Sequence, residues 1–184
     1  MVYDELIDRV GLGDIRDKVL AGERLQADDG LRLYACDEFP ILGYLANIVR
    51  ERKNGAATYY VRNQHINYTN VCNKLCKFCS FYVVPKDERG YVLSPAQVAA
   101  RVTEYSSAPI TEIHMVGGVN PQLPYAYYLD VLRAMKEARP AAHLKAFTMI
   151  ELAQIQRIAK KPLAEIFADM KAAGLESLPG GGAE

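Results

Sequence analysis

The sequence predicts an α/β fold, in which a helical segment precedes the first half of a parallel β/α barrel. Two observations support this prediction. Residues 1–57 place apolar side chains at three- and four-residue spacings, which is the pattern of amphipathic helices. From Thr58 onward, short runs of β-forming residues alternate with helical patterns, as they do where parallel strands are joined by helical crossovers.

The leader, residues 1–57, is expected to be helical until a stop signal. Its clearest apolar stripe is Phe39, Leu42, Leu45, Ala46 and Val49. The sequence "KNG" at 53–55 follows this stripe, and glycine is the usual residue just beyond the end of a helix. We therefore expect the leader to end shortly before the first strand.

Residues 58–184 are expected to contain four β/α units. The expected strands are TYYVRNQHIN (58–67), EIHMVG (112–117), HLKAFT (143–148) and GLESLP (174–179). The expected helices span residues 94–107, 125–140, 150–160 and 162–173. Ser94 is a good N-cap with Pro95 at the first helical position, while Pro140 and Gly174 are stop signals. Four units make half a barrel, so we expect the chain to be the N-terminal part of a longer protein.

Composition excludes several classes of protein. Half of the 184 residues are apolar, which is typical of a globular domain with a core. Lys plus Arg equals Asp plus Glu at 22 each, so no net charge attracts the chain to nucleic acid or to an anionic membrane. No secretory signal and no apolar run of about 20 residues is present. We expect a cytoplasmic protein without nucleic-acid or membrane partners.

Cys72, Cys76 and Cys79 lie within eight residues, in the segment expected to follow the first strand. Buried core thiols are one explanation, although such a cluster in a reducing compartment more often indicates a metal or catalysis. A zinc site needs four ligands, and His65 or Cys36 would have to complete it. A ferredoxin-type cluster also needs four thiolates. Three thiolates suit a four-iron cluster whose fourth iron stays open to an exchangeable ligand.

The pattern C-x3-C-x-aromatic-C, formed by Cys72, Cys76, Phe78 and Cys79, resembles the signature of radical S-adenosylmethionine (SAM) enzymes. The resemblance implies a [4Fe-4S] cluster held by the three cysteines, with SAM chelating the open iron through its amino nitrogen and carboxylate. Electron transfer to SAM then yields a 5′-deoxyadenosyl radical. It also implies that Phe78 lies near the adenine, with core packing as the alternative role for this side chain.

Gly117 and Gly118 fall at the expected C-terminal end of the second strand, where glycines let a ligand approach the backbone closely. An ordinary turn is the alternative. The resemblance implies that this pair contacts the amino group of SAM. His114, in the same strand, is expected to be packed rather than catalytic. The terminal "PGGGAE" offers amides for an anion beside Glu184, with a flexible loop as the alternative.

Longer segments resemble the radical SAM enzymes of futalosine-type menaquinone biosynthesis. These segments are HINYTNVCNKLCKFCSFY, HMVGGVNPQLPYAYYLDVLRAMKEA, KAFTMIEL and AAGLESLPGGGAE. "MVGG" and "KAFTMIEL" are most similar to aminofutalosine synthases, whereas cyclic dehypoxanthine futalosine synthases are expected to have Gln before the glycine pair. Asn120 departs from the pattern, because many aminofutalosine synthases have His there.

The resemblance implies an activity for the whole enzyme. The 5′-deoxyadenosyl group of SAM would add to 3-[(1-carboxyvinyl)oxy]benzoate and form 6-amino-6-deoxyfutalosine, with an electron donor such as flavodoxin or ferredoxin. The alternatives are cyclic dehypoxanthine futalosine synthase, a zinc-binding interaction module and a simple electron carrier. Half a barrel leaves strand edges exposed, so we expect the 184-residue chain alone to be inactive and poorly soluble.

Overall fold

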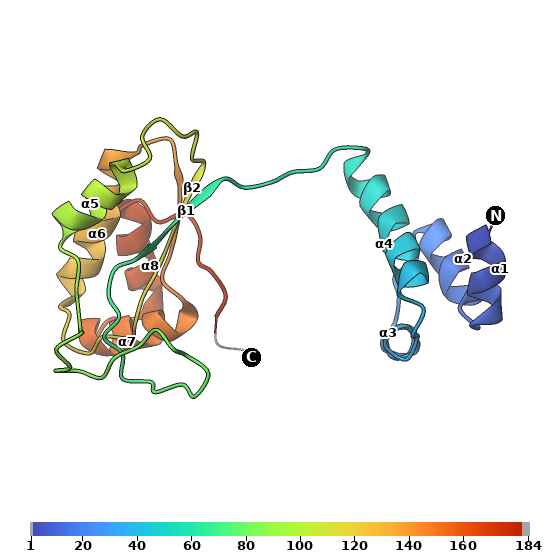
Figure 1. Cartoon of the computed structure of the whole chain (residues 1–184), viewed down its shortest axis with the longest axis horizontal. Helices are drawn as coiled ribbons and strands as arrows, with labels where there is room; N and C mark the ends of the chain where they lie inside the picture. The colour runs from blue at the N-terminus through green and yellow to red at the C-terminus, as the bar shows by residue number, and fades with distance from the viewer. Residues whose placement is uncertain (1, 182–184) are drawn as a thin grey trace. The chain divides into compact units, whose positions relative to one another are not determined.

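A computed structural model describes residues 2–181, and the chain divides into two compact units, Met1–Tyr60 and Val61–Glu184 (Figure 1). Each unit has its own hydrophobic core. None of the helices in the described part of the chain is long and apolar enough to span a membrane. The assignment of residues 1–57 as a separate leader domain stays a prediction.

The first unit consists of four helices, as its apolar spacing predicts. They are α1 (Val2–Arg9), α2 (Gly13–Ala21), α3 (Ala27–Tyr34) and α4 (Phe39–Asn54). Their buried side chains form one cluster that contains Ile7, Leu12, Ile15, Val19, Ile41 and Leu45. Cys36 is partly buried against this cluster, where a free cysteine packs as a small apolar side chain. The "KNG" signal is confirmed, because α4 ends at Asn54 and Gly55 has φ +60°.

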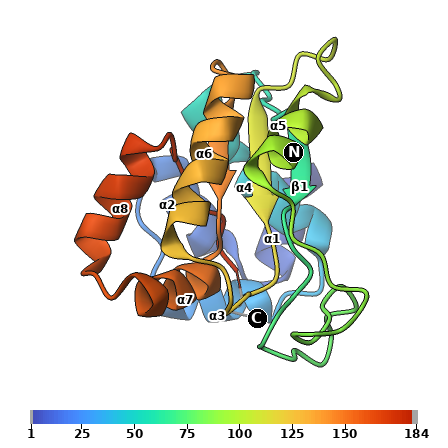
Figure 2. The same ribbon diagram turned by 90° about the vertical axis from the view of Figure 1, so that its left-hand side faces the viewer.

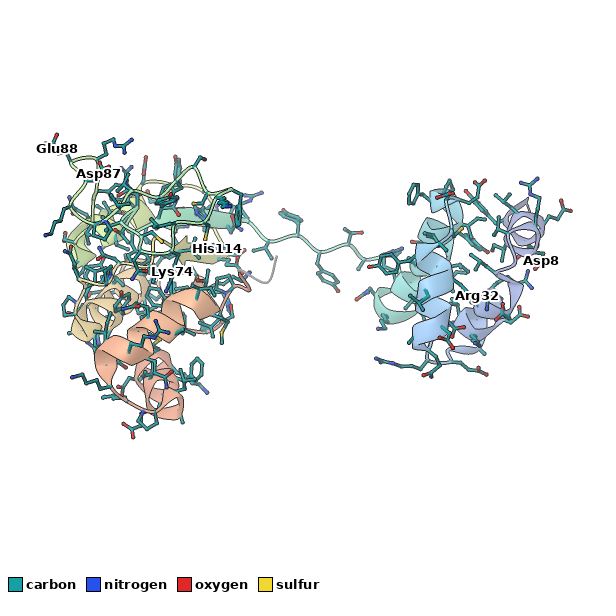
Figure 3. The ribbon with its side chains drawn as sticks, turned by 90° about the horizontal axis from the view of Figure 1, so that it is seen from below. Asp8, Arg32, Lys74, Asp87, Glu88 and His114 are labelled. Carbon is teal, nitrogen blue, oxygen red and sulfur yellow. The ribbon has the colours of Figure 1, made fainter. Side chains whose placement is uncertain are left out.

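Ion pairs connect the helices of the first unit. Arg16 contacts Asp8 at 2.9 Å, and Arg32 contacts Asp14 at 2.6 Å; Figure 3 labels Asp8 and Arg32. The hydrogen bond from Arg32 lowers the pKa of Asp14 to about 2. Because Asp8, Asp14 and Arg32 are exposed, water and salt screen both pairs, which add specificity to the helix packing rather than much stability.

The second unit contains a parallel sheet in the strand order β1-β2-β3. The strands are β1 (Asn63–Asn67), β2 (Glu112–Val116) and β3 (His143–Ala146). The helices are α5 (Pro95–Thr103), α6 (Tyr125–Ala138), α7 (Met149–Ala159) and α8 (Leu163–Ala172). Strand–helix alternation therefore produces the expected α/β fold. Figures 1 and 2 both show α5 and α6 side by side along one face of the sheet.

The two faces of this sheet differ in character because successive side chains of a strand point to opposite sides. The face toward α5 and α6 is apolar and belongs to the main core; it includes Ile66, Ile113, Met115, Leu144 and Ala146. The opposite face carries His65, His114 and Lys145, which are aligned by the strand register and remain partly exposed. In a β/α barrel this second face would be the interior.

The start and stop signals predicted for the helices of this unit are confirmed. Ser94 caps α5, with its hydroxyl accepting from the Gln97 amide, and Pro95 is the first helical residue. The second unit also places Gly174 at φ +109° just after α8. These signals depend on a few neighbouring residues, so the sequence alone suffices to identify them.

The expected fourth strand, residues 174–179, is reduced to a single bridge between Ser177 and Lys145 of β3. Ser177 donates to the Leu144 carbonyl and accepts from the Ala146 amide, so the segment does run parallel to β3. The next hydrogen bond of a parallel ladder would need an amide proton at position 179. Pro179 has none, which stops the ladder after one bridge.

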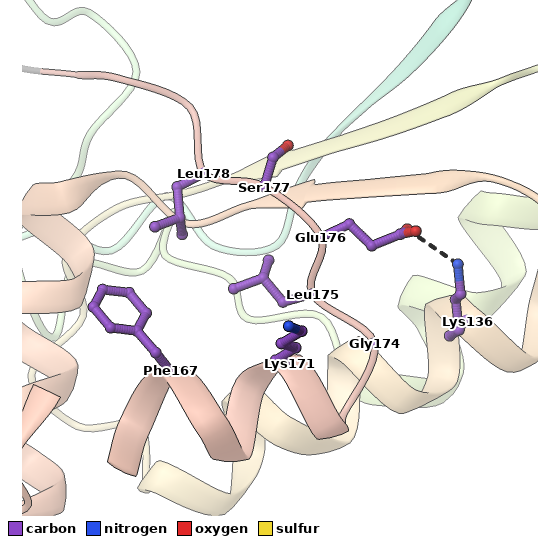
Figure 4. Close-up of a pocket in the computed structure, with 8 residues that line it drawn as sticks. All are labelled: Lys136, Phe167, Lys171, Gly174, Leu175, Glu176, Ser177 and Leu178. Carbon is purple, nitrogen blue, oxygen red and sulfur yellow. Dashed lines mark hydrogen bonds and ion pairs between the residues drawn. The ribbon is translucent and has the colours of Figure 1, made fainter. Parts of the chain in front are cut away.

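A pocket of about 570 Å³ lies between α8 and this bridged segment (Figure 4). Its lining includes Phe167, Leu175 and Leu178, together with the Lys136 and Glu176 ion pair at 3.1 Å. None of the described residues of the cysteine loop lines it. The pocket therefore belongs to the β3 edge of the sheet and not to the candidate cofactor site.

We predict that acid loosens the bridged segment. The Glu176 carboxylate accepts from the Leu144 amide at 2.9 Å, and this bond, together with Lys136, lowers the pKa of Glu176 below 4.5. A carboxyl with a depressed folded pKa contributes stability above its unfolded pKa and loses it as pH falls through the folded value. The protection factor of the Leu144 amide against hydrogen exchange should therefore fall below about pH 4.5, and it should be low at neutral pH in Glu176→Ala, which removes the acceptor. Unchanged exchange in this variant would refute the anchoring role.

Candidate cofactor site at the cysteine loop

Two buried polar side chains fix the base of the loop that follows β1. The Thr69 hydroxyl donates to the Tyr91 carbonyl at 2.6 Å. The Asn70 amide group donates to the Arg89 carbonyl at 3.0 Å and accepts from the Tyr91 amide at 2.8 Å. Because both side chains are more than nine-tenths buried, these bonds are shielded from water. They pin the segment that leads directly into Cys72.

The three cysteines lie in this loop at the C-terminal end of β1, as predicted. Cys72 and Cys79 are partly buried, and Cys76 is exposed. The Lys74 amide donates to the Cys72 sulfur at 3.4 Å (Figure 3). The loop therefore presents three thiols at the mouth of the sheet.

Phe78 does not pack in the core, so that alternative was wrong. Its side chain is 80% exposed, and Leu75 and Phe81 beside it are 53% and 41% exposed. A cluster of exposed apolar side chains around polar thiols is unusual on a surface that meets only water.

Gly117 and Gly118 follow β2 and press against the segment before the cysteines. A Cβ added at Gly117 would lie 2.7 Å from Cε1 of Tyr68 and 3.0 Å from the Thr69 carbonyl oxygen. A Cβ at Gly118 would overlap the Val71 carbonyl. The Gly118 amide also donates to the Thr69 carbonyl at 2.8 Å. Glycine is thus required by close packing of two backbones, which is more specific than the turn considered from sequence.

A buried carboxylate lies behind the glycine pair. Glu151 of α7 is 1% exposed and accepts from the Tyr68 hydroxyl at 2.7 Å and from the Gly117 amide at 3.1 Å. Burial raises the pKa of Tyr68 well above its usual value, so the phenol keeps its proton and acts as the donor. The strand that precedes the cysteines, the glycine pair and α7 therefore meet at one side chain.

The sheet face opposite α5 and α6, called the inner face from here on, carries a row of polar side chains. The rings of His65 and His114 lie 5.2 Å apart, and the Lys145 ammonium contacts the buried Glu112 carboxylate at 3.0 Å (Figure 3 labels His114). Partial burial, followed by the charges of His65 and Lys145, lowers the pKa of His114. His114 is therefore partly buried, with its ring facing this polar row; that it is packed rather than catalytic stays a prediction.

The donor chemistry of the loop fits an iron–sulfur cluster, since three soft thiolates come from one exposed loop. Between residues 2 and 181, no group of three or more His, Cys, Asp and Glu side chains is arranged as a metal site. The thiols thus share one loop without already forming a closed ligand set. Gly182 and Glu184, from the expected terminal anion site, lie outside the described residues.

The comparisons with known proteins agree with this architecture. Residues 66–181 match the model of the Radical SAM superfamily, from the end of β1 through the bridged segment. The chain belongs to the radical SAM superfamily. In this family a [4Fe-4S] cluster and SAM are the general cofactors. The cluster is therefore the candidate ligand of the cysteine loop.

Two curated relatives come from the futalosine pathway. The chain is 42% identical over 170 residues to the aminodeoxyfutalosine synthase of Thermus thermophilus, covering 92% of this chain and 46% of that protein. It is 36% identical over 176 residues to the cyclic dehypoxanthine futalosine synthase of Halalkalibacterium halodurans, covering 95% and 48%. The chain therefore spans about half the length of the curated relatives it matches.

A solved structure shows the same fold at low sequence identity. The crystal structure of methylornithine synthase superposes with a TM-score of 0.58 at 15% identity, covering 90% of this chain and 57% of that one. At such identity the likeness concerns the fold alone. It agrees with the prediction of a partial radical SAM barrel.

Sequence reasoning missed the residues that support the loop. Thr69 and Asn70 precede the cysteines in "NYTNVC", and a pair of hydrogen-bonding side chains directly before a ligand loop was a readable signal. Glu151 could have been noticed as the third position after Thr148, which is the pattern of a capping box. Its contact with Gly117 left no local signal, because 34 residues separate the two.

We predict that Gly118→Ala disrupts the loop. Its new Cβ would meet the backbone at Val71, which cannot rotate away as a side chain can, so the free energy of unfolding should fall by about 1–3 kcal/mol. Chemical denaturation measures this change. Gly43→Ala is the matched control, since nothing lies within 4 Å of that site in α4. It should raise stability by about 0.5–1 kcal/mol; equal effects of the two variants would contradict the prediction.

Proposed function

We propose that this chain is the N-terminal part of a radical SAM enzyme of the aminodeoxyfutalosine synthase type. The single observation that supports this most is the cysteine loop at the end of β1, packed against Gly117 and Gly118, within a chain 42% identical to such an enzyme. A second aminodeoxyfutalosine synthase, from Streptomyces coelicolor, is 40% identical over 171 residues.

Cys72, Cys76 and Cys79 would hold the cluster, and Gly117 and Gly118 would contact the amino group of SAM. When bound, a four-iron cluster with SAM supplies one-electron reductive cleavage of the sulfonium bond. The chain's own residues would bind the cluster and SAM and orient them. The Lys74 amide donates to the Cys72 sulfur, and the exposed Phe78 ring offers an apolar face for the adenine.

The substrate would be a small molecule bound over the inner face of the sheet. His65 and His114 place hydrogen-bonding groups on that face at the middle of β1 and β2. Barrel enzymes build their sites at the C-terminal ends of such strands. The proposed substrate is 3-[(1-carboxyvinyl)oxy]benzoate, and the product is 6-amino-6-deoxyfutalosine. A small electron-transfer protein such as flavodoxin or ferredoxin would supply the electron.

Cyclic dehypoxanthine futalosine synthase is the second candidate, favoured by the 36% identity to one such enzyme. Product analysis with the intact protein separates the two. Incorporation of the adenosyl group into product supports the first activity, whereas release of 5′-deoxyadenosine supports the second. A zinc-binding interaction module would consume no SAM and would give neither result.

Electron paramagnetic resonance tests the cofactor assignment. Anaerobically reconstituted, dithionite-reduced protein should show a four-iron signal that changes when SAM is added. Cys76→Ser should lose this signal, because it removes a ligand. Cys36→Ser is the control and should keep it, since Cys36 packs against the core of the first unit. A folded protein with no SAM-dependent signal would overturn the proposal.

We also predict that Phe78→Ala separates binding from stability. Because the ring is 80% exposed, its removal should change the free energy of unfolding by less than about 0.5 kcal/mol. The dissociation constant for SAM, measured by equilibrium dialysis, should rise about tenfold through loss of a stacking surface. Phe39→Ala, at a side chain 74% exposed in the first unit, should change neither quantity. Unaltered SAM binding by Phe78→Ala would remove the proposed role.

A further inference from the structure

Glu151 makes more hydrogen bonds than a helix cap requires. One carboxylate oxygen accepts from the Thr148 amide at 2.7 Å, which completes the capping box of α7. The other oxygen accepts from the Tyr68 hydroxyl and from the Gly117 amide, at 2.7 and 3.1 Å. The side chain thus joins a local contact, three residues away, to two contacts that are distant in sequence.

The capping box of α5 shows what a cap alone needs. There Gln97 occupies the same position, and its single amide oxygen accepts from the Ser94 amide at 2.8 Å. A neutral glutamine is therefore sufficient to cap a helix in this protein. A glutamine at position 151 could serve the Thr148 amide in the same way, but its NH₂ group would then face the Gly117 amide, which can only donate, and the Tyr68 hydroxyl would have to turn and accept. Only a carboxylate satisfies all three partners.

Burying a carboxylate costs free energy, so its presence at position 151 needs a reason beyond helix capping. Burial raises the pKa of Glu151, while the hydrogen bonds from Thr148, Tyr68 and Gly117 act in the opposite direction. An amide could supply a cap without a buried charge, since the exposed Gln97 caps α5 with a neutral oxygen. The second oxygen must therefore serve the glycine pair and its neighbour Tyr68.

The two peptides around Gly117 are held from different sides. The Gly117 amide donates to Glu151, and the Gly118 amide donates to the Thr69 carbonyl at 2.8 Å. No described peptide bond is cis, so the carbonyl of Gly117 points opposite to the Gly118 amide and thus away from Thr69. This carbonyl is an acceptor of fixed direction, suited to an ammonium group.

From this geometry we propose that Glu151 is a positioning residue for SAM: it fixes the peptide at Gly117 so that the glycine pair presents its backbone to the ammonium group of the ligand. The inference rests on the proposed function, in which this pair contacts SAM. Glu151 itself is buried and acts only through Gly117. Its role differs from that of a structural cap, whose loss would lower stability and leave SAM binding unchanged.

The test compares Glu151→Gln with Thr148→Ala in the reconstituted full-length chain. The second variant removes the hydroxyl that accepts from the Glu151 amide at 3.2 Å and so weakens the same helix end, but it leaves the carboxylate on Gly117. Both variants should lower the melting temperature. Glu151→Gln should raise the SAM dissociation constant at least tenfold, whereas Thr148→Ala should change it less than threefold.

Hydrogen exchange of the Gly117 amide supplies a readout that does not depend on SAM. The amide should be protected in the wild-type chain and in Thr148→Ala, and should exchange faster in Glu151→Gln. Fast exchange in the folded wild-type chain would overturn the inference even if Glu151→Gln did not fold. If the wild-type chain binds SAM and Glu151→Gln binds it equally well, the inference fails and the proposed function stands. If the wild-type chain binds no SAM, both fail.

Discussion

The candidate site depends on the close backbone contact between Gly117–Gly118 and residues 69–71. Without side chains on the glycines, the end of β2 approaches the segment before Cys72 closely enough for direct amide-to-carbonyl bonding. Thr69 and Asn70 hold the other side of the same segment. The positions of the cysteine loop and of the glycine pair are therefore set together. A shift in either strand end would move both.

The same strands build the fold and supply its chemistry because side chains alternate along them. Ile113 and Met115 bury one face of β2 against helices, while His114 between them points to the polar inner face. Phe147 continues β3 with φ +62°, a conformation that costs a non-glycine residue about 1–3 kcal/mol. Aromatic packing on Tyr68 and Tyr128 holds it there. This bend turns the chain into α7 and brings Glu151 under the glycine pair.

Much of the fold could be predicted because its determinants are local. Ser94, Pro95 and Gly174 act through neighbours within a few residues, and the cysteine spacing is itself a short pattern. The length of the fourth strand could not be judged from its apolar residues, because one missing amide proton at Pro179 decided it. The sequence left two roles open for Phe78, near the adenine or in the core, and only its exposure in the fold excludes the core. The link from Glu151 to Tyr68 spans 83 residues, and no periodicity reports such a contact.

That long separation has a consequence for biosynthesis. Translation produces the cysteines first, then the glycine pair, and Glu151 only afterwards. A nascent chain that has exposed Cys72 and Cys79 therefore still lacks the carboxylate that secures the neighbouring peptide. Domains fold as units when enough of their chain has left the ribosome. The loop acquires its complete support late, so a metal cluster delivered during synthesis would meet an immature site, and one delivered after α7 has folded would meet a finished one.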